Sequence, residues 1–288
     1  MQNRIIELKL RSKLLFILLA FPLLLAAQDK SLVVLHLNDT HSRIEPFPEN
    51  DSRNPDKGGV IRQEAYMEEV RRENKNVLLF HSGDFVQGTP YFNLFGGEAE
   101  MAVANFMKVD AACLGNHEFD NGLAFLANLL RMAKFPFLTT NLDFTGTPVE
   151  GLTKEYAILE RDGLKIGLIG LTIDPDNLVA KNNYAGMKYL DPIESANRVA
   201  AFLKEKEACD LIICLSHLGY YPSEKPVGDI TLAKESRNID IILGGHSHTF
   251  LQQPDRRLNL DGKEVVINQT GAYGIYVGRL DIVLEEMK

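Results

Sequence analysis

The sequence predicts an α/β fold whose functional side chains gather at one edge of a β-sheet. Short apolar runs rich in β-branched residues alternate with amphipathic runs of helical spacing, which is typical of strands joined by helices. Five of the apolar runs end in aspartate, asparagine or histidine, the side chains that commonly bind metals. Because open α/β sheets bind ligands at the carboxyl ends of their strands, we expect one shared site there.

The elements of the first half can be assigned in chain order. We predict strands over residues 31–37, 76–81, 110–114 and 136–142. We predict helices, from their apolar spacing, over residues 59–74, 98–108 and 123–133. The proline-containing segment 42–58 and the glycine-containing segment 88–97 are predicted to be loops.

The second half begins with a predicted hairpin. The Asp-Gly pair at 162–163 favours a type I′ turn between strands 156–159 and 164–172. Asp191, Pro192 and Glu194 are start signals for a helix over 191–207. The later elements are predicted as strands 210–215 and 239–243, a helix at 229–237, and a tail, 263–268 with 273–284, that forms an antiparallel pair closing the sheet.

Residues 1–27 differ from the rest of the chain. Four basic residues precede an apolar run over residues 14–27, an order typical of a secretory signal. The run is short for a membrane span, and an uncleaved N-terminal anchor is the alternative interpretation. We therefore predict a signal peptide at 1–27, one large domain at 28–288, and an exported protein, periplasmic or extracellular, with no stable membrane span after cleavage.

The composition argues against nucleic acid as a partner. The chain has 288 residues, 45% of them hydrophobic, and a net charge of −8, which repels a phosphate backbone. Phosphate chemistry would therefore need bound cations. Cys113, Cys209 and Cys214 lie in or beside apolar runs and are interpreted as core residues. Asn38 and Asn268 open Asn-x-Thr sequons that we interpret as chance matches.

The stretch GNHEFDNG, residues 115–122, lies between a predicted strand and a predicted helix. Asn116 can offer its carbonyl oxygen to a hard cation, while His117 stays free to move a proton. The alternative is a polar turn in which Asp120 or Asn121 caps the following helix.

The other strand ends supply a complementary set of side chains. These are Asp39, His41, Asp84, His217, His246 and His248. Residues two apart in an extended chain project to the same side, so the Asp-x-His and His-x-His pairs can each face one cavity. Imidazole, carboxylate and amide ligands together suit zinc, manganese or iron better than calcium or magnesium. The set has no thiolate, so a structural zinc site is not indicated.

Some polar and aromatic residues receive a structural interpretation. His36 and His81 lie in apolar strands and are assigned to the core or to the support of the site. Glu118 and Gln87 could support the site, but the sequence does not decide. We interpret three aromatic side chains as packing residues rather than as a base-stacking platform: Tyr91, Phe92 and Phe95.

The motifs Asp-x-His, Gly-Asp, Gly-Asn-His-Glu, a single His and Gly-His-x-His, in this order, resemble the binuclear metallophosphoesterases. The strings LNDTHSRIEPF, GDFVQGTP, GNHEFDNG, TTNL, SHLG and GGHSHT are similar to the catalytic domain of the 5′-nucleotidase family. The resemblance implies that residues 28–288 form a metallophosphoesterase catalytic domain. It implies a β-sandwich of mixed sheets flanked by helices, in a four-layer αββα arrangement.

The resemblance also implies roles for the strand-end residues. Two divalent ions, zinc, manganese or iron, would be bound in a binuclear centre. One ion would be held by Asp39, His41, Asp84 and His248, and the other by Asp84, Asn116, His217 and His246. His117, oriented by Asp120, would act on the leaving group, and Asn116 and His117 would contact the phosphate.

The implied activity is hydrolysis of nucleoside 5′-monophosphates or related nucleotides to nucleoside and phosphate. The alternatives are a 2′,3′-cyclic nucleotide phosphodiesterase, a broad phosphomonoesterase, or an inert catalytic-fold subunit of a two-chain complex. Full-length family members carry a C-terminal domain that grips the nucleotide, whereas this sequence ends at Lys288, where the catalytic domain would end. We therefore expect a separate C-terminal nucleotide-binding-domain protein as a possible partner.

Overall fold

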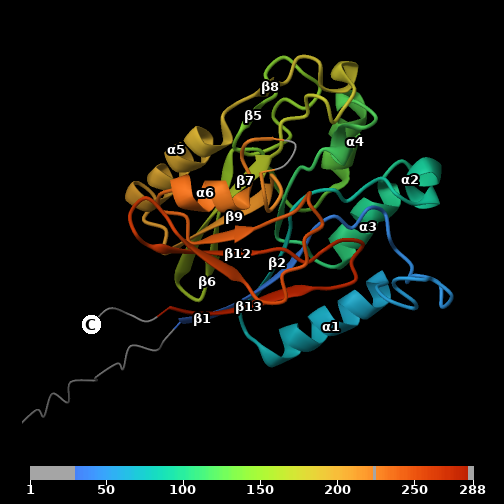
Figure 1. Ribbon diagram of the computed structural model, residues 1–288, viewed down its shortest axis with the longest axis horizontal. Helices are drawn as coiled ribbons and strands as arrows, with labels where there is room; N and C mark the ends of the chain where they lie inside the picture. Colours follow the sequence, from blue (N-terminus) through green and yellow to red (C-terminus); the bar gives the residue numbers. More distant parts are fainter. Residues whose placement is uncertain (1–29, 223–224, 285–288) are drawn as a thin grey trace, which may run out of the picture.

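Two β-sheets pack face to face, and helices cover both outer surfaces (Figure 1). The computed structural model describes residues 30–222 and 225–284, so the predicted signal peptide at 1–27 lies outside the described residues. The expected four-layer αββα sandwich is confirmed. Within the described ranges, no helix has the length and apolar character that a membrane crossing requires.

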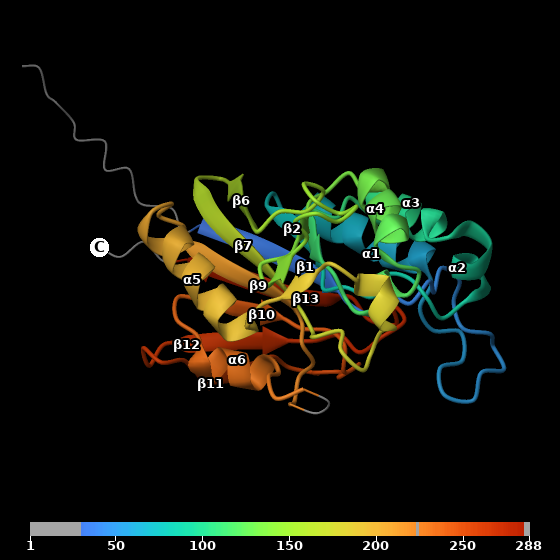
Figure 2. The same cartoon turned by 90° about the horizontal axis from the view of Figure 1, so that it is seen from above.

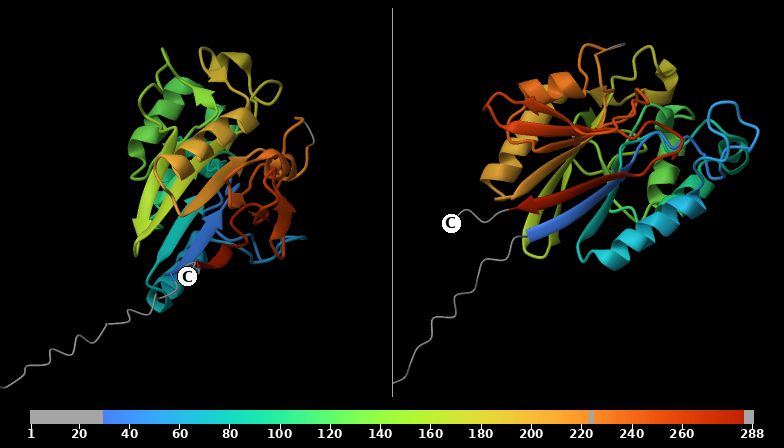
Figure 3. Two further views of the ribbon diagram at one scale, coloured as in Figure 1. Left: turned by 90° about the vertical axis from the view of Figure 1, so that its left-hand side faces the viewer. Right: turned by 60° about the horizontal axis from the view of Figure 1, so that its bottom comes forward.

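The first sheet has the strand order β13-β1-β2-β3-β4. Its strands are β1 (Lys30–Leu37), β2 (Val77–His81), β3 (Ala111–Cys113), β4 (Phe137–Leu138) and β13 (Gly278–Leu284). Strands β1 to β4 run parallel, and β13 runs antiparallel to β1. Because Lys30 lies opposite Leu284 in this register, the two ends of the described chain lie side by side (Figure 3).

The second sheet has the order β11-β12-β10-β9-β7-β6. Its strands are β6 (Tyr156–Arg161), β7 (Leu164–Thr172), β9 (Leu211–His217), β10 (Ile241–Leu243), β11 (Asp255–Leu258) and β12 (Glu264–Asn268). The four central strands run parallel and the two edge strands antiparallel. A separate short pair joins β5 (Leu142–Asp143) to β8 (Lys188–Tyr189).

Helices from the two halves of the chain cover opposite faces of the sandwich (Figure 2). The first sheet packs against α1 (Val60–Glu73), α3 (Glu98–Phe106) and α4 (Leu123–Met132). The second packs against α5 (Pro192–Glu205) and α6 (Asp229–Glu235). Shorter helical turns are α2 (Pro90–Phe95), η1 (His117–Phe119) and η2 (Lys181–Tyr184).

The central strands are apolar on both faces because each face is covered. In β1, Leu32 and Val34 pack between the two sheets, while Leu35 packs toward the helices of the first sheet. Phe80 of β2 and Leu168 of β7 are fully buried in the layer between the sheets. Continuous apolar runs, rather than alternating ones, are what parallel strands covered on both sides require.

Two local predictions are confirmed in detail. The side chain of Asp191 accepts a hydrogen bond from the backbone N–H of Glu194 at 2.8 Å, which caps α5. Asp162 and Gly163 have φ angles of 51° and 75°, the positive values that a type I′ turn requires between β6 and β7.

Other local predictions are wrong. The predicted loop at 88–97 contains α2, which starts with Pro90 in its first turn, where the missing N–H costs nothing. The predicted strand 136–142 is split, because its last residue pairs with β8 in a separate short sheet. Strand β11 was not predicted at all.

The predicted pairing of the tail is also wrong. Strand β12 pairs with β10 and β11 in the second sheet, whereas β13 pairs with β1 in the first. Residues 269–277 therefore cross from one sheet to the other. The sequence of each segment indicates that it forms a strand. Which neighbouring strand it pairs with depends on how the two sheets pack together.

Truncation of a side chain between the sheets should destabilise the whole domain. For Leu168→Ala we expect the free energy of unfolding to fall by about 2–5 kcal/mol, because the substitution leaves a cavity between two rigid sheets. Urea unfolding measures the loss. Leu258→Ala is the matched control, since Leu258 is 65% exposed and should change stability little. Equal effects of the two substitutions would contradict the assigned core.

Candidate metal centre

Strands of both sheets end at the same side of the sandwich and bring the predicted site residues together. Three groups have ligand atoms that all lie within 4.8 Å of one another. They are Asp39 with His41 and His248, His41 with Asp84 and His117, and Asp84 with His217 and His246. Asn116 joins the last group, because its Oδ1 lies 2.9 Å from Nδ1 of His246. The strands that carry these residues belong to two facing sheets rather than to one.

The backbone turns sharply at five of these positions. Residues with a left-handed conformation are Asp39 (φ 50°), His41 (49°), Asp84 (57°), His246 (70°) and His248 (52°). Each such non-glycine residue costs on the order of 1–3 kcal/mol, and this strain is typical of functional sites. Backbone hydrogen bonds hold the turns in place, from Asp39 N to Gly83 O at 3.0 Å and from His41 N to Asp84 O at 3.1 Å.

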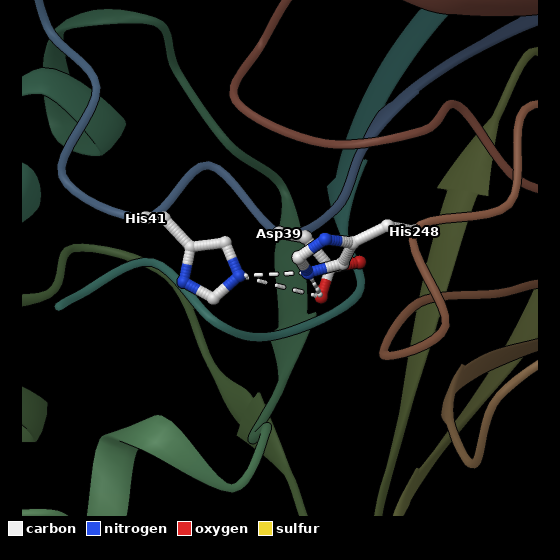
Figure 4. Close-up of side chains that lie close together, drawn as sticks. All are labelled: Asp39, His41 and His248. Carbon is white, nitrogen blue, oxygen red and sulfur yellow. Dashed lines mark hydrogen bonds and ion pairs between the residues drawn. The ribbon is translucent and has the colours of Figure 1, made fainter. Parts of the chain in front are cut away.

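The first group forms a convergent set of two nitrogens and one oxygen. Oδ1 of Asp39 lies 3.4 Å from Nε2 of His248 and 3.9 Å from Nε2 of His41. The two Nε2 atoms are 3.0 Å apart. In Figure 4 the three side chains point toward one another. Such a mixed nitrogen and oxygen set matches the preference of zinc and similar divalent metals.

In the third group, a ring nitrogen and a carboxylate oxygen face each other in a buried site. Nδ1 of His217 lies 2.6 Å from the carbonyl oxygen of Ser82, which can only accept, so Nδ1 carries the proton. Nε2 of His217 lies 3.1 Å from Oδ2 of Asp84 and makes no hydrogen bond with any described residue. Both side chains are buried. This arrangement favours positive charge between the two atoms, which either a proton on Nε2 or a metal cation can supply.

The pKa values of His217 and Asp84 also favour positive charge between the two side chains. Burial alone would lower the pKa of His217, but Asp84 outweighs it and the pKa is raised to about 10. Burial likewise raises the pKa of Asp84, yet the neighbouring histidines lower it overall. The ligand set therefore stabilises added positive charge at its centre.

Asp84 lies between the first group and the third group. Its Oδ2 is 3.1 Å from His217 and 3.9 Å from Nε2 of His41, and its Oδ1 accepts a hydrogen bond from the backbone N–H of His117 at 2.9 Å. A Cβ atom at Gly115 would collide with the Asp84 carboxylate, so only glycine permits this approach. Asp84 thus belongs to two of the three groups.

His117 and Asp120 form a pair at the open side of the site. Nδ1 of His117 lies 2.7 Å from Oδ2 of Asp120, and the side chain of His117 is 30% exposed. Burial lowers the pKa of His117, but the hydrogen bond that its ring donates to Asp120 and the charge of Asp84 raise the pKa to about 9. Gly122 occupies the N-cap position of α4, so the alternative that Asp120 or Asn121 caps this helix is wrong.

Glu118, whose role the sequence left open, joins two loops of the centre. Its Oε2 accepts hydrogen bonds from the backbone N–H groups of Asp84 at 3.0 Å and Gly115 at 2.6 Å, and its Oε1 accepts one from Phe85 at 2.8 Å. The side chain is 1% exposed. Burial and the charge of Asp84 raise the pKa of Glu118 to about 7, against the lowering effect of the N–H donors.

Two supporting residues were missed by the sequence reasoning. Asn38 donates to Oδ2 of Asp39 at 2.6 Å and to the carbonyl of Gly271 at 2.7 Å, which orients the carboxylate. Gln269 donates to the carbonyl of Gly245 at 2.7 Å and accepts from the hydroxyl of Ser247 at 3.0 Å, which holds the His246 loop. The position of Asn38 next to Asp39 was an available signal, whereas Gln269 had none.

Most residues given a structural interpretation are buried as expected. His36 is buried, which lowers its pKa to about 3, and His81 is 2% exposed. The three cysteines are buried and unpaired. Phe92 packs in the core, whereas Phe95 is 51% exposed.

The structure also locates the two sequon asparagines and Gln87, whose role the sequence left open. Asn38 and Asn268 are buried, at 1% and 6% exposure, and both side chains are hydrogen-bonded, which confirms that the sequons are chance matches. Gln87 has a left-handed backbone (φ 70°) and lines the cleft beside His117.

Two curated relatives of this chain are named 5′-nucleotidase. The human 5′-nucleotidase is 33% identical over 282 residues, covering 91% of this chain and 48% of that protein. A snake venom 5′-nucleotidase from Crotalus adamanteus is 31% identical over 285 residues, covering 91% of this chain and 46% of that protein. The chain therefore spans about half the length of the curated relatives it matches.

A solved structure shares the fold. The 5′-nucleotidase precursor from Thermus thermophilus superposes with a TM-score of 0.81 at 34% identity, covering 89% of this chain and 52% of that one. The family model described as calcineurin-like phosphoesterase matches residues 32–250. These matches agree with the two facing sheets and the candidate ligands at the strand ends. The chain belongs to the calcineurin-like phosphoesterase family and is homologous to 5′-nucleotidases.

Proposed function

We propose that this chain is a metal-dependent phosphoesterase that hydrolyses nucleotides, foremost nucleoside 5′-monophosphates. The observation that carries the proposal is the convergence of carboxylate, imidazole and amide ligands around the buried Asp84, with His117 beside them. The relatives named 5′-nucleotidase support the nucleotide as substrate.

We propose a binuclear centre in which Asp84 contacts both ions. One ion would be held by Asp39, His41, Asp84 and His248, and the other by Asp84, Asn116, His217 and His246. When bound, two divalent ions supply Lewis-acid stabilisation of the phosphoryl group and lower the pKa of a water molecule. The nitrogen-rich set favours zinc, manganese or iron.

His117 is assigned the proton transfer of the proposed reaction. Because its Nδ1 is engaged by Asp120, Nε2 is the ring atom free to meet the substrate in the cleft that His117 lines. We assign His117 to proton donation to the leaving oxygen, and Asp120 to fixing the ring in that orientation. Asn116 and His117 are assigned to contacts with the phosphate.

A substrate panel tests the proposed activity. Nucleoside 5′-monophosphates should release phosphate faster than 2′,3′-cyclic nucleotides or aryl phosphates. Preference for the cyclic compounds would instead favour a phosphodiesterase, and equal rates would favour a broad phosphomonoesterase. Failure to hydrolyse any of them with metal present would favour an inert subunit and contradict the proposal.

We also propose that the protein is exported. The basic residues followed by an apolar run in residues 1–27 support this, although the segment lies outside the described residues. Fractionation of the native cells would locate the protein, and recovery only from the cytoplasm would contradict export. Co-purification from the same fraction would test the expected nucleotide-binding partner.

Removal of metal should abolish phosphate release. A chelator should eliminate the activity, and manganese or zinc should restore it, because the buried ligands supply too little positive charge on their own. Elemental analysis should find two divalent ions per active chain. Full activity in a chain freed of metal would contradict the binuclear proposal.

Substitutions at the centre should separate metal binding from catalysis. Asp84→Asn should lose both bound metal and activity, because the bridging charge is removed. His117→Ala should lower kcat by about 10²–10⁴ while metal content stays near normal, since His117 is assigned to proton transfer. Metal analysis and phosphate release measure the two effects. Loss of metal in His117→Ala would refute its assigned role.

Glu118 should act through the loops that it joins. Glu118→Gln keeps the shape but turns one acceptor oxygen into a donor that faces backbone N–H groups. We expect the unfolding free energy to fall by about 1–3 kcal/mol and the affinity for metal to weaken. Glu69→Gln on the exposed face of α1 is the control. Identical stability and metal affinity in the two variants would contradict this role.

A further inference from the structure

The carboxylate of Asp229 is buried next to the strand ends that carry two of the candidate ligands. Asp229 is the first residue of α6, and its side chain is completely buried. One of its oxygens, Oδ2, makes no hydrogen bond with any described residue. Because a buried carboxylate is costly, its presence here indicates a role that an apolar side chain could not fill.

This carboxylate contacts the ends of two neighbouring parallel strands, β9 and β10. The hydroxyl of Ser216, the residue before His217, donates a hydrogen bond to Oδ1 of Asp229 at 2.5 Å. Oδ2 lies against Gly244, the first residue after β10, where a Cβ atom would collide with it. Asp229 thus touches the chain one residue before His217 and two residues before His246.

The backbone at the start of α6 is fixed to the same region. The N–H group of Asp229 donates to the carbonyl oxygen of Gly219 at 2.8 Å, two residues beyond His217. The N–H group of Tyr220 donates to the hydroxyl of Ser247 at 2.9 Å, so the loop after β9 meets the loop after β10. The start of α6 is therefore bonded to the chain on both sides of His217.

The two strand ends that this carboxylate contacts serve one of the two proposed ions. His217 and His246 are both assigned to that ion, which we call the second ion. The first ion has ligands that are anchored elsewhere. These include His41, which follows β1, and His248, whose loop is held by hydrogen bonds to Gln269.

We propose that Asp229 is a positioning residue that sets the affinity of the centre for the second ion. The inference rests on the proposed function, because it concerns the proposed binuclear centre. Through Ser216 and Gly244, the carboxylate fixes where the ends of β9 and β10 lie, and with them the imidazoles of His217 and His246. Substitution of residues that orient metal ligands from behind typically lowers metal affinity by about 10–100-fold.

Asp240 provides a matched control on the same two strands. It lies directly before β10, and its Oδ2 accepts a hydrogen bond from the backbone N–H of Ile212 in β9 at 2.8 Å. This carboxylate therefore joins β9 and β10 at the ends opposite to the metal centre. Asp240→Ala should lower the stability of the domain without weakening the binding of metal.

Manganese titration of the full chain, freed of metal, tests the role of Asp229 in two backgrounds that tell the ions apart. His248→Ala removes a ligand of the first ion, so that binding of the second is measured, and His246→Ala does the reverse. Asp229→Ala should weaken manganese binding about 10–100-fold in the His248→Ala background and leave it nearly unchanged in the His246→Ala background. Asp240→Ala should leave it nearly unchanged in both.

A double-mutant cycle tests the link to Ser216. Ser216→Ala removes the hydroxyl donor and should weaken binding of the same ion. The combination with Asp229→Ala should weaken it no further than the more severe single substitution, because both remove one link. Additive losses would overturn the assignment. Thermal unfolding verifies that each variant is folded, and Ser216→Ala carries the test if Asp229→Ala is not.

The outcomes distinguish the inference from the proposed function. If the unsubstituted chain binds fewer than two manganese ions, the proposed binuclear centre fails. If it binds two and Asp229→Ala weakens binding equally in the two backgrounds, or changes it no more than Asp240→Ala does, the assignment of Asp229 alone is overturned.

Discussion

The structure depends on one buried carboxylate, Asp84, and on the positive charge that its surroundings demand. Asp84 lies 3.1 Å from a ring nitrogen of His217 that has already committed its other nitrogen to a carbonyl. A buried carboxylate beside a ring nitrogen is costly unless a proton or a metal cation lies between them. The site therefore favours added positive charge, and the loops that carry it contain several left-handed turns of the kind found at functional sites.

The two-sheet architecture is what makes this arrangement possible. Loops after β1, β2 and β3 arrive from one sheet, and loops after β9 and β10 arrive from the other. Neither set alone contains all the candidate ligands. Glu118, Asn38 and Gln269 join the loops through side-chain to backbone hydrogen bonds, so that the positions of the ligands are fixed before any ion binds.

The centre has a closed side and an open side. Asp39, Asp84 and His217 are almost completely buried, which strengthens electrostatic interactions and excludes water. His117 and His248 are partly exposed and face the cleft that Arg43 and Tyr273 line. The buried candidate ligands thus lie on the closed side, while His117 and His248 reach the cleft.

The sequence by itself indicated most of the elements, the candidate ligand types and the family, although it missed α2 and β11. Helix caps such as Asp191, the Asp-Gly turn and the Asp, Asn and His side chains at strand ends are local features, and local features are readable from neighbouring residues. Only the tertiary structure decided which strands pair, that the tail divides between the two sheets, and that Asp120 contacts His117 rather than capping α4. It also revealed the role of Gln269, because that role depends on contacts between segments far apart in the chain, which no local pattern encodes.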